Sequence, residues 1–89
     1  MDRFEEIKQK LIHLFLHGAY VNVTSNGFRL QIWENDLGYY HWTLSRKRPW
    51  YYMTGECRLK QMEECLDDLV RLFISKIGDK PIRNHIKLD

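Results

Sequence analysis

The chain has 89 residues, of which 44% are apolar, and its formal net charge is +2. A chain of this length buries only about 60 to 65% of its unfolded surface, so we expect one domain, residues 1–89, without a deep catalytic cleft. The small net charge excludes a field strong enough to drive generic binding to DNA or to anionic lipid.

No apolar run is long enough to cross a membrane, and the first residues lack the cationic and apolar stretches of a signal peptide. These features predict a cytoplasmic protein that makes no membrane contact.

The first predicted element is a helix over residues 2–18. Asp2 can cap it with Glu5 three residues later, and apolar residues follow at helical spacing until Gly18.

Two strand-like runs follow, over residues 19–24 and 28–34, and Asn26 and Gly27 between them are the strongest short signal for a hairpin. Both residues tolerate positive φ, and a two-residue turn fixes the register. One face of the hairpin is then aliphatic and should cover the helices; it consists of Val21, Val23, Leu30 and Ile32. The other face carries Tyr20 opposite Trp33.

A third strand is predicted over residues 39–45. Its alternation sends Tyr40, Trp42 and Leu44 inward, so Tyr39 and His41 join the outer face. A basic loop follows, and residues 50–53 are expected to form a short fourth strand.

Thr54 can cap a long second helix that ends before Gly78. Cys57 and Cys65 would then lie in this helix, about 12 Å apart along its axis, too far for a disulfide. The sequence therefore predicts two reduced thiols. The last residues, 79–89, are expected to be a mobile tail or an extra edge strand.

The order of these elements predicts an α+β fold: a helix, a three- or four-stranded antiparallel sheet, and a second helix. Both helices should cover one face of the sheet, which leaves the other face open.

This layout resembles that of double-stranded RNA-binding domains, and residues 54–60 lie where that family places the basic start of its second helix. Only Arg58 and Lys60 stand where the family has a run of lysines, so the sequence does not identify the chain as a member. In size and layout the chain also resembles accessory proteins of phages and mobile elements, many of which block a larger host enzyme.

The sequence concentrates aromatic and basic residues on the outer face and in the loop after the third strand. Such residues can anchor a protein interface, hold phosphates or stack on bases. The predicted partner-binding residues are Tyr20, Trp33, Tyr39, His41, Arg46, Lys47, Arg48 and Trp50.

The leading hypothesis is a non-enzymatic module that binds a partner protein as a modulator or inhibitor. Nucleic-acid binding through the same surface is the alternative, and a homodimer is the third. No catalytic constellation, metal-ligand set or phosphate-binding loop is evident, so neither an enzyme nor a metal or other cofactor is expected.

Overall fold

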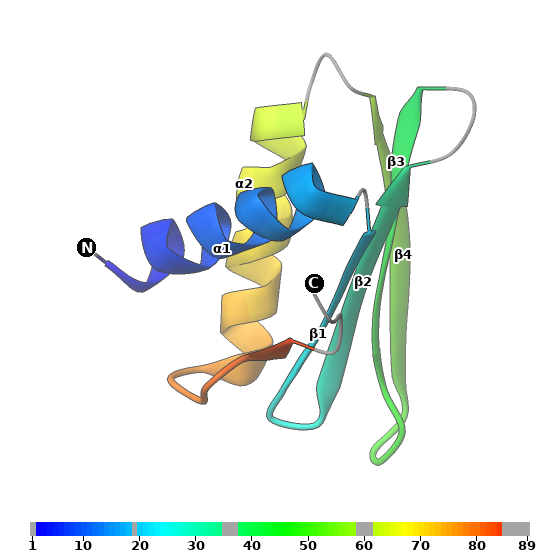
Figure 1. Cartoon of the computed structure of the whole chain (residues 1–89). Helices are drawn as coiled ribbons and strands as arrows, with labels where there is room; N and C mark the ends of the chain where they lie inside the picture. The colour runs from blue at the N-terminus through cyan, green and yellow to red at the C-terminus, as the bar shows by residue number, and fades with distance from the viewer. Residues whose placement is uncertain (1, 19, 35–37, 59–61, 85–89) are drawn as a thin grey trace.

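The computed structural model describes residues 2–18, 20–34, 38–58 and 62–84. The elements follow in the order α1 (Arg3–Gly18), β1 (Tyr20–Ser25), β2 (Phe28–Glu34), β3 (Tyr39–Arg46), β4 (Tyr51–Arg58), α2 (Met62–Ile77) and β5 (Arg83–Asn84). The strands form one antiparallel sheet in the order β4-β3-β2-β1-β5. Both helices lie on the same side of it (Figure 1). The predicted α+β fold is confirmed, and β5 is the fifth strand of the sheet.

The hairpin between β1 and β2 forms as the sequence predicts. Asn26 and Gly27 have φ values of 51° and 82°, in the region that a tight two-residue turn requires. The register pairs Val23 with Leu30 and places Tyr20 opposite Trp33. The turn residues therefore fixed which side chains of both strands face the helices.

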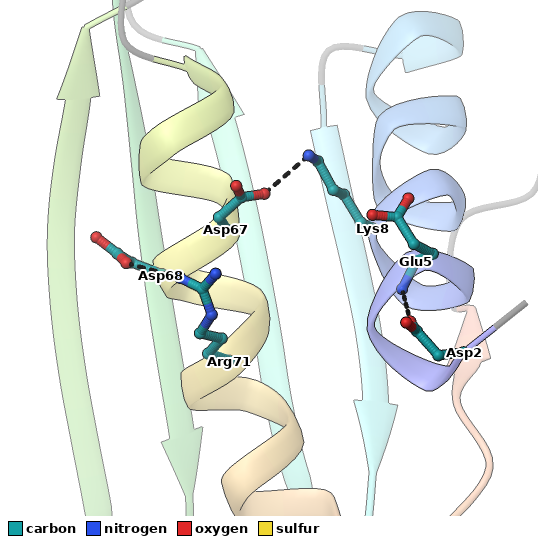
Figure 2. A network of polar contacts seen from close by, with 6 residues as sticks. All are labelled: Asp2, Glu5, Lys8, Asp67, Asp68 and Arg71. Atoms are coloured by element: carbon teal, nitrogen blue, oxygen red, sulfur yellow. Dashed lines mark hydrogen bonds and ion pairs between the residues drawn. The ribbon is translucent and has the colours of Figure 1, made fainter.

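Helix α1 begins with the predicted cap, since the Asp2 carboxylate accepts a hydrogen bond of 2.8 Å from the backbone N–H of Glu5 (Figure 2). Further along α1, Lys8 Nζ lies 2.8 Å from Asp67 Oδ1 of α2 (Figure 2). This ion pair links the two helices on the side of the domain away from the open face of the sheet.

The core lies between the helices and the inner face of the sheet. Its fully buried members come from every layer and include Ile7, Leu11, Val21, Val23, Leu30, Leu44, Val70, Phe73 and Ile77. Tyr40 is also buried, and this burial, together with the charge of Glu34, raises the pKa of its phenol.

The prediction that the second helix starts at Thr54 is wrong. Residues 54–58 continue β4, which runs beside β3 along its whole length and pairs Thr54 with Thr43. Gly55 lies opposite Trp42, where the indole ring occupies the space that a Cβ would need. The backbone of β3 needs a partner over its full length, and this tertiary demand overrides the local capping signal of Thr54.

The prediction of two reduced thiols is also wrong. Cys57 lies near the end of β4 and Cys65 lies in α2, and a disulfide joins them with a Cα–Cα distance of 6.0 Å. The error follows from the helix boundary, because Cys57 belongs to β4 and Cys65 to α2, so the spacing that a single helix would impose does not apply. Disulfides are typical of oxidising compartments, so the redox state of this pair in the cell is the measurement that tests the predicted cytoplasmic location.

The predicted extra edge strand is present as β5, whose Arg83 and Asn84 pair with Thr24 and Val23 of β1. Residues 85–89 of that predicted segment lie outside the described residues, as does Leu59 of the predicted second helix. Among the described residues, no helix is long and apolar enough to span a membrane.

Candidate functional site

The predicted binding residues lie at two opposite ends of the sheet. Three of the predicted rings form one row across the sheet, because Tyr20 pairs with Trp33 and Trp33 pairs with His41. The cations of the β3–β4 loop lie at the other end of β3. Ser45 comes four positions after His41, which is about 13 Å along an extended strand.

The rings of the first row are held by their neighbours. The centroids of the Trp33 and His41 rings lie 4.7 Å apart, and the amide of Gln31 donates a hydrogen bond of 2.9 Å to the Tyr20 hydroxyl. Trp33 and His41 are half-buried, whereas Tyr20 is 37% exposed. The side chains of this row therefore pack mainly on one another, and they offer little free surface to a partner.

His41 also makes polar contacts to β4. Its Nε2 lies 2.8 Å from Thr54 Oγ1, and its Nδ1 lies 3.3 Å from Glu56 Oε1. The Thr54 hydroxyl in turn donates to the backbone oxygen of Trp42 at 2.9 Å. Next to this group, the Arg58 guanidinium lies 5.7 Å from the centroid of the Tyr39 ring. These contacts hold His41 and Tyr39 as parts of the sheet.

The hairpin end is different, because its large side chains are open to solvent. Trp50 is 74% exposed, and its ring is stacked on that of Tyr52 with centroids 6.3 Å apart and planes 8° apart. Tyr52 is 54% exposed and Met53 is 42% exposed. The sequence prediction missed Tyr52 and Met53, although the alternation of β4 could have placed Tyr52 beside Trp50.

The three loop cations do not play the same part. Arg46 is half-buried: its guanidinium lies 4.3 Å from the centroid of the Phe28 ring, and its Nε donates to the backbone oxygen of Pro49 at 3.2 Å. Arg46 therefore helps to shape the loop. Lys47 and Arg48 are exposed at its tip.

No family model, curated protein or solved structure matches this chain. The resemblance to double-stranded RNA-binding domains rested on residues 54–60 as the start of a helix, and residues 54–58 form part of β4 instead. Within the described residues, no group of three or more His, Cys, Asp or Glu could hold a metal ion.

The free edge of the sheet is formed by β4, beside the exposed rings of Trp50 and Tyr52. β4 is the outermost strand beyond β3, and no other described strand pairs with it. Its first five residues, 51–55, carry no charge, whereas natural edge strands are usually protected by charges, proline or bulges. The exposed side chains of Tyr52 and Met53 thus lie on an edge that can accept another strand.

Proposed function

We propose that this protein is a non-enzymatic interaction module that binds a partner protein through the free edge of β4, as a modulator or inhibitor of that partner. The observation that carries the proposal is the exposure of Trp50, Tyr52 and Met53 beside the uncharged first part, residues 51–55, of the edge strand β4. Exposed large apolar side chains of this kind mark interaction sites, and Trp and Tyr are the residues that interface centres favour.

The chemistry of the surface indicates the kind of segment that would bind. Main-chain hydrogen bonds to β4 suit an extended strand of the partner, a mode of recognition in which side-chain pockets supply the specificity. Residues 51–55 are uncharged, while Lys47 and Arg48 lie at the tip of the preceding loop. The matching segment is therefore apolar where it meets β4 and acidic where it meets the loop.

The test compares wild-type protein with a variant whose edge is blocked. Tyr52→Lys and Met53→Lys together place charges on the free edge, which disfavours strand addition. The protein captured from a nuclease-treated extract by wild type and not by this variant is purified and titrated by calorimetry.

In that titration Trp50→Ala should weaken binding by about 2 kcal/mol or more, as expected for an aromatic side chain that the partner buries at the centre of the interface. Tyr20→Ala is the matched control, since Tyr20 is an exposed ring at the other end of the sheet. The binding free energy of this variant for the partner should stay within about 0.5 kcal/mol of the wild-type value. Unchanged affinity on replacing Trp50 contradicts the proposal. Light scattering tests the homodimer alternative. If the protein is a dimer that Met53→Lys dissociates, the partner bound at β4 is a second copy of the chain.

A further inference from the structure

A basic groove of about 1090 Å³ lies at the hairpin end of the sheet, apart from the free edge of β4. Three segments line it: the β1–β2 turn, the β3–β4 loop and the chain leading into β5. The two hairpin connections reach the same end of the sheet (Figure 1). Five cations line the groove, namely Arg29, Arg46, Lys47, Arg48 and Arg83, and none of the described lining residues is Asp or Glu.

The strand register builds one wall of this groove. Thr24 of β1 pairs with Arg83 on one side and with Arg29 on the other, and Arg29 pairs with Ser45 of β3. These residues share the outer face, so cations alternate with hydroxyls across the sheet. Neighbouring strands are about 4.8 Å apart, which places the backbones that carry Arg83 and Arg29 about 10 Å from each other.

The cations of the groove have no carboxylate within salt-bridge distance among the described residues. Arg29 donates to the amide oxygen of Asn22 at 3.2 Å, and Arg46 is held by Phe28 and Pro49, so two of the guanidinium groups are kept in place by neutral partners. Five cations gathered in this way repel one another unless an anion lies between them.

Flat rings continue this row at its far end. Ser45 pairs with Tyr52 of β4, and the exposed Trp50 ring stacks on Tyr52. A ligand that fills the groove and extends to these rings contacts cations and hydroxyls in the groove and open aromatic faces at its end. Nucleic acid has the matching order of groups, phosphates along the strand and flat bases beside them.

We propose that this groove binds the phosphate backbone of a single-stranded nucleic acid, with Trp50 and Tyr52 available to stack on its bases. A single strand fits better than a duplex, because only unpaired bases offer their faces to a protein ring. Trp50 and Tyr52 belong to the edge proposed for strand addition as well, whereas Arg29 and Arg83 lie on β2 and β5, away from that edge.

The test is the salt dependence of binding to a labelled mixed-sequence oligonucleotide of about 12 nucleotides, a length within the usual range of single-strand sites. If all five cations meet phosphates, affinity should fall about 100-fold between ~50 and ~200 mM salt, from a slope of about 0.7 per contact. The double variant Arg29→Gln/Arg83→Gln should bind more weakly at ~50 mM salt, and its affinity should fall only about 20-fold over the same range.

The matched control removes two cations from the helices instead. Lys10→Gln/Arg71→Gln has the same net charge as the groove variant and should keep the wild-type salt slope, because both side chains are exposed on α1 and α2. Thermal unfolding of both variants checks that they remain folded.

Three outcomes would overturn the proposal: no binding at ~50 mM salt, equal slopes for the groove variant and wild type, or a duplex of the same sequence that binds as tightly as the single strand. Polyglutamate serves as the acidic-protein probe. If it displaces the oligonucleotide at equal charge concentration, the groove recognises acidic polypeptide and the assignment to nucleic acid is wrong. None of these outcomes depends on the protein partner proposed for β4.

Discussion

Gly55 lies in β4 directly opposite Trp42, and the indole ring covers the position where any other residue would carry its Cβ. A Cβ at Gly55 would lie 2.7 Å from the Cε2, Cζ2 and Nε1 atoms of the ring. Trp42 is packed against the core, so the ring cannot move away without disturbing its neighbours. Gly55→Ala should therefore destabilise the domain.

The magnitude is the difference between two effects. Forcing an extra carbon into a packed site costs about 1 to 3 kcal/mol. Replacing glycine by alanine recovers about 0.4 to 1 kcal/mol, because the unfolded chain loses conformational freedom. The free energy of unfolding should thus fall by about 1 kcal/mol, and Tm should fall by about 4 to 8 °C for a domain of this size.

Thermal and urea unfolding without reductant measure this change, and the control is the same substitution made in a Trp42→Phe background. Phenylalanine is smaller than the indole, so Gly55→Ala should cost at least about 0.5 kcal/mol less in that background. If Gly55→Ala is as stable as wild type, or costs the same in both backgrounds, the contact with Trp42 does not explain the glycine.

Three further predictions concern the disulfide, a buried phenol and the helix pair. Reduction of the Cys57–Cys65 disulfide, whose sequence separation is 8, should lower the free energy of unfolding by about 2.5 kcal/mol. Alkylation of untreated native protein should label neither cysteine. Labelling of both cysteines would contradict the disulfide. Because burial raises the pKa of Tyr40, the unfolded chain loses this proton first, so stability should be unaffected below about pH 9 and should fall as the pH rises through about 10. Tyr40→Phe should remove that loss in urea unfolding at about pH 11, and an unchanged pH dependence would refute it. Lys8 and Asp67 have side chains 16% and 31% exposed, so a double-mutant cycle should give a coupling of about 1 kcal/mol, and a coupling near zero would show that the pair contributes nothing.

The local signals of the chain predicted most of the fold. Asp2 caps α1, and Asn26 with Gly27 sets a two-residue turn whose register decides the facing of both strands. These features depend on neighbouring residues alone, so they can be read from the sequence. Alternation along β3 likewise places Tyr40 inside and His41 outside.

The candidate site was predicted only in part. The loop cations and Trp50 lie together at the hairpin end, as the sequence indicated, but Arg83 joins them through the pairing of β5 with β1. That contact connects segments about 60 residues apart, and no local pattern encodes such a pairing.

The sequence by itself determined the presence of the two helices, the first hairpin and the alternation of inward and outward residues, because each follows from contacts within a few residues. Tertiary structure decided the length of β4, the disulfide between Cys57 and Cys65, and the groove. In each case distant segments overrode or completed the local preference: β3 required a partner strand beyond Thr54, and burial against α2 brought the two cysteines together.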